Sequence, residues 1–80
     1  MEKLIKFEKE QCMPCRMVES LLKSKGIEAV KYDVLKDSEL VEQYGIMSVP
    51  TVILLDDNNS EIQRVTGFKP AELEELISKL

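Results

Sequence analysis

The spacing of hydrophobic positions in the first half of the chain predicts a strand, a helix and a second strand. Residues 3–7 (KLIKF) are short and apolar enough for a strand. From Met13 onward, apolar residues recur at helical spacing and predict a helix with one buried face. The residues on that face are Met17, Val18, Leu21 and Leu22. Gly26 ends the helix, and residues 27–34 (IEAVKYDV) predict a strand parallel to the first, as in a βαβ unit.

The second half of the chain predicts a short helix followed by an antiparallel hairpin. Either Asp37 or Ser38 can cap the short helix, and Gly45 ends it. Residues 51–55 (TVILL) form the most apolar run and predict a central strand. Residues 61–65 (EIQRV) alternate as the half-exposed partner strand of a hairpin would.

A last helix completes the predicted fold. Pro70 suits its first turn. Its apolar face contains Leu73, Leu76, Ile77 and Leu80. The predicted order is β-α-β-α-β-β-α, an α/β fold with a four-stranded mixed sheet and helices packed on both faces. No linker or repeat interrupts residues 1–80, so we expect one domain.

Composition excludes several classes of function. Hydrophobic residues make up 44% of the chain and charged residues 32%, which is typical of a small globular domain. The net charge is -4 and no basic cluster occurs, so we expect no nucleic-acid binding. The chain has no histidine, which excludes histidine-assisted catalysis and mixed Cys/His zinc sites.

The sequence predicts a cytoplasmic protein that does not bind membranes. Its first residues, MEKLIKFEKE, alternate charged and apolar side chains too often for the core of a signal peptide. No apolar run approaches the roughly 20 residues of a membrane span. In the cytoplasm, a Cys-x-x-Cys pair is more often catalytic or metal-binding than structural.

Cys12 and Cys15 are the only cysteines, and they lie at the start of the first predicted helix. The unpaired N–H groups of a first helical turn favour a thiolate, and such sites lower a thiol pKa from ~8.5 to about 7 or below. We therefore expect Cys12 to attack a disulfide, and the more sheltered Cys15 to resolve the mixed disulfide. Pro14 is tolerated in the first turn and stiffens the link between the two sulfurs.

Metal binding is an alternative for a lone Cys-x-x-Cys pair. Zinc and iron–sulfur sites need a second set of ligands, which this chain lacks. We therefore expect no resident metal. A non-catalytic binding module, or two chains that share a metal between them, stays open as the alternative to a redox enzyme.

The segment before the central strand predicts a substrate-binding site. Pro50 gives up a ladder hydrogen bond there, and a turn with a cis X-Pro bond can be accommodated. The backbone N–H and C=O of Val49 would then face outward, where an extended peptide can pair with them. Met13 and Met47 predict an adaptable apolar surface around Cys12.

Together these motifs resemble the thioredoxin superfamily. The motifs are Cys12-Met13-Pro14-Cys15, Tyr44-Gly45-Ile46, Val49-Pro50-Thr51 and Val65-Thr66-Gly67. The resemblance covers essentially the whole chain. It implies the thioredoxin fold, trimmed of the extra N-terminal strand and helix as in glutaredoxins. It also implies a cis peptide bond between Val49 and Pro50, beside Cys12.

Within that superfamily, the motifs favour a small thioredoxin-like or thioredoxin–glutaredoxin hybrid reductase. Pro14 and the Val-Pro-Thr motif are similar to those of thioredoxins. Gln11 replaces the family's tryptophan before the first cysteine, and Lys6 stands where thioredoxins usually carry a buried acid. Lys9 matches a lysine that glutaredoxins use for the glutathione carboxylate, although the glycines and aspartate that hold glutathione are missing.

Lys6 and Lys9 each have two interpretations. Lys6 is either a cation that stabilises a nearby thiolate, or a lysine whose stem packs on the sheet while its amine reaches Glu8 or Asp33. Lys9 is either a solvated loop charge or a contact for glutathione or a partner protein.

The resemblance implies a monomeric thiol–disulfide oxidoreductase that reduces disulfides of partner proteins. It would need no cofactor other than the redox-active disulfide between Cys12 and Cys15. The chain is too short for a flavin or nicotinamide domain, so its electrons must come from elsewhere. The implied donor is a thioredoxin-reductase-like flavoenzyme or glutathione, and a glutaredoxin-like, glutathione-dependent reductase is the alternative.

Overall fold

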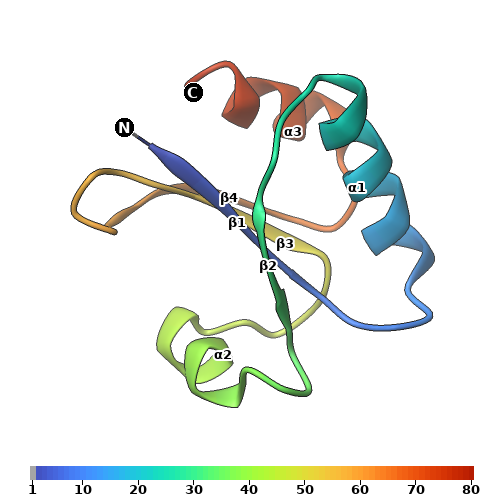
Figure 1. Ribbon diagram of the computed structural model, residues 1–80, viewed down its shortest axis with the longest axis vertical. Coiled ribbons are helices and arrows are strands. Elements are labelled where there is room, and N and C mark those ends of the chain that lie inside the picture. The colour runs from blue at the N-terminus through green and yellow to red at the C-terminus, as the bar shows by residue number, and fades with distance from the viewer. Residues whose placement is uncertain (1) are drawn as a thin grey trace.

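The computed structural model describes residues 2–80 and has the predicted order of elements (Figure 1). The strands are β1 (Lys3–Glu8), β2 (Val30–Asp33), β3 (Thr51–Leu55) and β4 (Glu61–Thr66). The helices are α1 (Met13–Ser24), α2 (Ser38–Tyr44) and α3 (Pro70–Ile77). Within the described residues, none of these helices has the length and apolar character that crossing a membrane requires.

β1 and β3 occupy the middle of a mixed sheet with the strand order β2-β1-β3-β4. β1 runs parallel to β2, as the βαβ unit predicts, and antiparallel to β3. β3 and β4 form the predicted antiparallel hairpin. Every residue of β3 is buried, which confirms that this segment is a central strand.

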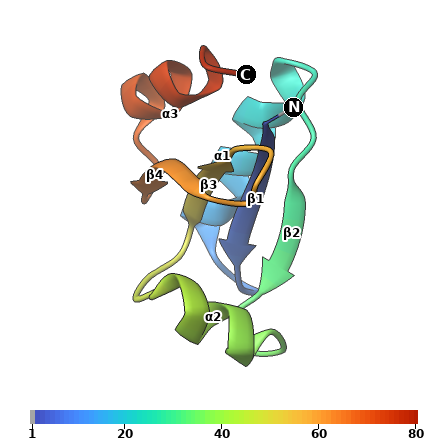
Figure 2. The same ribbon diagram turned by 90° about the vertical axis from the view of Figure 1, so that its left-hand side faces the viewer.

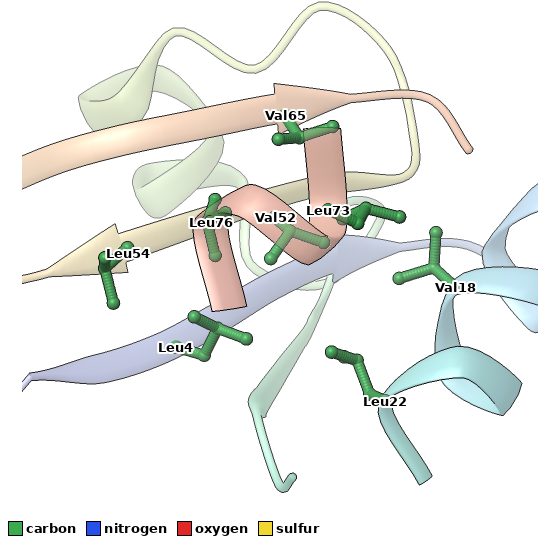
Figure 3. Packing of buried hydrophobic residues seen from close by; sticks show 8 residues of the cluster. All are labelled: Leu4, Val18, Leu22, Val52, Leu54, Val65, Leu73 and Leu76. Carbon is green, nitrogen blue, oxygen red and sulfur yellow. The ribbon is translucent and has the colours of Figure 1, made fainter. Parts of the chain in front are cut away.

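Helices cover both faces of the sheet, as predicted. Leu4 of β1 packs in a cluster with residues of α1 and α3, whereas Phe7 of the same strand packs in a second cluster with residues of α2. Figure 3 shows the first cluster, which contains Leu4, Val18, Leu22, Val52, Leu54, Val65, Leu73 and Leu76. In Figure 1, α2 lies on the opposite side of the sheet from α3, and in Figure 2 α3 lies above the strands and α2 below them. The interior residues of β1 are therefore buried on both faces of the sheet.

The second strand begins later than predicted, at Val30. The backbone N–H of Ile27 donates to the carbonyl of Leu22 at 2.9 Å, and Gly26 has a φ of 67°. Both are features of a helix that ends in a left-handed glycine cap. Residue 27 therefore closes α1, and pairing with β1 starts only after the chain has turned back toward the sheet.

Two side chains predicted on buried helix faces are exposed. Met17 is 45% exposed, because α1 turns the side that carries Val18 and Leu22 inward. Leu80 is 50% exposed, because α3 ends at Ile77 and the last residues lie beyond it. The helical period identified the apolar side of each helix, but the edge of the buried stripe depends on how the helix lies on the sheet.

Candidate active site

Cys12 is the N-cap of α1, and Cys15 lies in the first turn of that helix. Their side chains form a disulfide across a Cα–Cα distance of 5.2 Å. The backbone N–H of Cys15 donates to Sγ of Cys12 at 3.2 Å. Cys12 is 7% exposed and Cys15 is 4% exposed, so Cys15 is only slightly more sheltered. The sulfur of Cys12 therefore lies at the end of the helix where N–H groups and the helix dipole favour negative charge.

The pairing of β1 with β3 places Val49 and Pro50 at the same end of the sheet as the cysteines. Phe7 pairs with Thr51, so the start of β3 lies beside the end of β1, from which the chain continues to Cys12. The peptide bond between Val49 and Pro50 is cis, as predicted. Within residues 2–80, the backbone of Val49 makes no hydrogen bond with the rest of the protein.

Two cavities adjoin at this end of the sheet. The first has a volume of about 320 Å³ and we call it the disulfide cavity; it is lined by Glu8, Lys9, Glu10, Gln11, Cys12, Cys15, Arg16 and Glu19. The second has a volume of about 360 Å³ and we call it the Val49 groove; it is lined by Lys9, Val34, Ile46, Met47, Ser48 and Val49. Lys9 lines both cavities and so lies where they meet.

The structure brings most of the predicted site residues to these two cavities. Met47 is 96% exposed in the Val49 groove, and Pro50, three residues later in the chain, is buried. Met13 and Pro14 are exposed on the helical turn between the cysteines. Lys9 is exposed between the disulfide and the groove, a position compatible with either of its interpretations.

Comparison with known proteins reveals several relatives. The sequence model of the glutaredoxin family matches residues 4–65. The SPbeta prophage-derived thioredoxin-like protein YosR of Bacillus subtilis is 42% identical over 78 residues, covering 98% of each chain. Thioredoxin of Bacillus subtilis is 36% identical over 75 residues, covering 85% of this chain and 71% of that protein. The crystal structure of the Drosophila melanogaster thioredoxin Deadhead has a TM-score of 0.86 at 29% identity, covering 99% of this chain and 80% of that chain.

The chain belongs to the thioredoxin superfamily. It has the thioredoxin fold, and it is a thiol–disulfide oxidoreductase whose Cys-x-x-Cys motif consists of Cys12 and Cys15. Thioredoxin and glutaredoxin family proteins act on disulfide substrates, and a reductase or glutathione supplies their electrons. The fold and the reaction type predicted from the motifs are thereby confirmed.

Lys6 is a buried cation in the middle of this thioredoxin sheet. It is 1% exposed and pairs across the sheet with Val52, whose side chain belongs to the cluster under α1 and α3. Its ammonium lies 3.0 Å from a carboxylate oxygen of Glu8 and 3.8 Å from one of Glu19. The expected contact with Glu8 is therefore present. The carboxylate of Asp33 accepts the backbone N–H of Leu35 at 2.8 Å.

Glu19 is a residue of the site that sequence reasoning missed. It lines the disulfide cavity, and its carboxylate pairs with both Lys6 and Lys31. A hydrogen bond from Lys31 lowers the pKa of Glu19, and the charge of Lys6 lowers it further. Lys6 and Lys31 are direct partners in the register of β1 and β2, so two like charges lie side by side. The sequence carried no signal for this contact, because the register that makes the two lysines neighbours is set only in the folded sheet.

Two substitutions of Lys6 distinguish the contribution of its buried stem to stability from the contribution of its charge. We expect Lys6→Met to keep the free energy of unfolding within about 1 kcal/mol of the parent, because Glu8 and Glu19 are partly exposed and can regain water. Lys6→Ala should lose about 2–4 kcal/mol, because a buried stem is removed. Urea unfolding measures both values, and Lys31→Met is the control on an exposed lysine. Equal losses for Lys6→Met and Lys6→Ala would mean that the ion pairs, and not the stem, stabilise the fold.

Proposed function

We propose that this oxidoreductase reduces disulfides of partner proteins, with Cys12 as the nucleophile and Cys15 as the resolving cysteine. The observation that supports these roles is the hydrogen bond from the N–H of Cys15 to Sγ of Cys12, at 3.2 Å. After reduction of the disulfide, that N–H would point to the sulfur that carries the negative charge. Cys15 does not occupy the cap position, because it lies inside the first turn of α1.

The proposed reaction has two exchange steps. First, the Cys12 thiolate attacks one sulfur of the partner's disulfide, forms a mixed disulfide and releases the partner's other sulfur as a thiolate, which takes up a proton. The thiol of Cys15 then loses its proton, and its thiolate attacks Sγ of Cys12. The bond between Cys12 and the partner breaks, and the partner leaves as a dithiol. Two electrons have passed to the partner, and the disulfide between Cys12 and Cys15 has formed again.

We assign docking of the substrate to the Val49 groove. The backbone N–H and C=O of Val49 make no hydrogen bond within the described residues, so an extended peptide could pair with them. Pro50 holds this turn at the start of β3. Met47, in the groove, and Met13, next to Cys12, offer flexible apolar contacts that suit partners of varied sequence.

Reduction of the disulfide requires an external donor, for which we propose a thioredoxin-reductase-like flavoenzyme. The protein itself needs no cofactor beyond its two cysteines. We place it in the cytoplasm, where thiols are kept reduced, and expect it to act as a monomer. Cell fractionation tests the location, and sedimentation tests whether the mass in solution is the 9.2 kDa of one chain.

Glutathione is the second candidate donor. The match of residues 4–65 to the glutaredoxin family favours it, and so does Lys9 at the disulfide cavity, where it could contact a glutathione carboxylate. Against it, the glycines and aspartate expected to hold glutathione are missing from the sequence.

Serine variants of the two cysteines test the proposed roles. With a small disulfide-bonded protein such as insulin, Cys15→Ser should accumulate the mixed disulfide, because nothing displaces the partner from Cys12. Cys12→Ser should trap at least about tenfold less. Mass spectrometry under non-reducing conditions measures the trapped species. Equal trapping by both variants would contradict the assignment of nucleophile and resolver.

Met47→Ser tests the Val49 groove as the docking site. We expect the variant to raise KM for a protein disulfide by up to about tenfold while kcat changes little, because one apolar contact is lost. A small aromatic disulfide that does not reach the groove should react at the parent rate. Leu80→Ser is the matched control, since Leu80 is also exposed but lines a different cavity with Leu4 and Val30. A similar rise in KM for both variants would contradict the assignment of the Val49 groove as the docking site.

Coupled assays distinguish the two donors. Insulin reduction is followed once with NADPH and a thioredoxin reductase, and once with NADPH, glutathione and glutathione reductase. We expect the flavoenzyme route to be faster by at least about tenfold, because the glutathione-binding residues are missing. Lys9→Ala should then leave both rates nearly unchanged. A faster glutathione route that Lys9→Ala slows would make the glutathione-dependent reductase the function.

A further inference from the structure

Glu19 lies between two cavities. It lines the disulfide cavity, and it also lines a cavity of about 260 Å³ beside α1 and β2, together with Lys6, Leu22 and Lys31. Lys6 lines only the second of these cavities. The wall next to the disulfide therefore contains the carboxylate, and the buried ammonium that pairs with it lies on the other side.

A connected set of charges runs from β2 to the disulfide. Lys31 of β2 pairs with Glu19 of α1. Lys6 of β1 pairs with Glu19 at 3.8 Å and with Glu8 at 3.0 Å. Both carboxylates line the disulfide cavity. Lys6 thus pairs with Glu8 and Glu19 at the wall of the cavity in which the thiols form, and Lys31 pairs with Glu19.

We propose that Lys6, acting through Glu8 and Glu19, sets the reduction potential of the Cys12–Cys15 pair. Lys6 and Glu19 are positioning residues in this sense, since neither exchanges a bond with the substrate. The proposal rests on the redox activity of the pair but not on which cysteine attacks first.

Thiol ionisation connects these charges to the potential. Reduction adds two electrons to the two sulfurs, and it takes up two protons when both become thiols or one proton when one stays a thiolate. A carboxylate in the same cavity repels a thiolate, whereas a buried ammonium attracts it through a medium of low dielectric constant. Glu19 is ionised at neutral pH, since Lys31 and Lys6 lower its pKa. Whatever stabilises the thiolate favours the reduced protein and raises the potential.

Other charged groups also face the disulfide and must be separated from this set. Lys9 and Glu10 belong to the loop before the cysteines, and Arg16 follows Cys15 on α1. The Val49 groove contributes only Lys9 among its charged lining residues. Lys23 of α1 adds a smaller effect on Glu19. Glu10 is the natural control, because it lines the disulfide cavity and is exposed to solvent.

Two variants should move the potential in opposite directions. Glu19→Gln removes a negative charge from the cavity wall, so the reactive thiol should ionise about 0.5 to 1 pH unit lower and the protein should become more oxidising. Lys6→Met removes the cation and leaves both carboxylates, so ionisation should move up and the protein should become more reducing. Each shift in the equilibrium with glutathione should be about three- to tenfold, where tenfold corresponds to about 30 mV.

The experiment equilibrates the parent and each variant with glutathione and glutathione disulfide at pH 7 and pH 8. Mass spectrometry after alkylation gives the reduced fraction, and the alkylation rate against pH gives thiol ionisation. Lys6→Arg should restore the parent potential, and Glu10→Gln should shift the equilibrium less than twofold. Unfolding curves show whether each variant is folded. If Lys6→Met is not folded, Glu19→Gln by itself tests the proposal.

Shifts of Glu19→Gln and Lys6→Met in the same direction, or both below twofold, would overturn the proposal. A shift in Glu10→Gln as large as that in Glu19→Gln would also overturn it. The total charge of the cavity, and not the contact with Lys6, would then explain the change in potential. Failure of the trapping experiment with the serine variants would not affect this result, because an equilibrium does not depend on which cysteine attacks. The two proposals can therefore fail separately.

Discussion

The antiparallel pairing of β1 with β3 brings the two parts of the active site together. It places the start of β3 beside the end of β1, with Phe7 opposite Thr51. One side of this junction leads to Cys12 at the cap of α1, and the other comes from the turn at Val49. A change of one residue in this register would exchange the two faces of β1 and move the disulfide away from the turn.

Burial of β1 on both faces explains the unusual place of Lys6. The strand has apolar clusters above and below it, so a lysine in its interior must either pack its stem or leave the sheet. Lys6 packs its stem and directs its ammonium to Glu8 and Glu19. A buried charge costs free energy unless it is paired, and here the partners come from the strand itself and from α1. The same partners line the disulfide cavity, which links a packing requirement to the chemistry of the site.

Few elements form the redox site. Thioredoxin of Bacillus subtilis has a longer chain, of which this match covers 71%, whereas YosR matches over 98% of its length. The helix that carries the cysteines, the turn before β3 and the sheet between them all lie within the described residues. One helix end and one strand end meet to form the site.

The amino-acid sequence alone predicts the order of the elements, the place of the cysteines at a helix start and the turn before the central strand. These features are local, because periodicity, helix caps and proline act over a few residues. Three other features follow only from the folded chain: Glu19 joins Lys6 to Lys31, Lys9 lies where two cavities meet, and Met17 is exposed. Each of these features depends on how segments far apart in the chain meet, and side-chain partners from such segments leave no periodic signal along the chain.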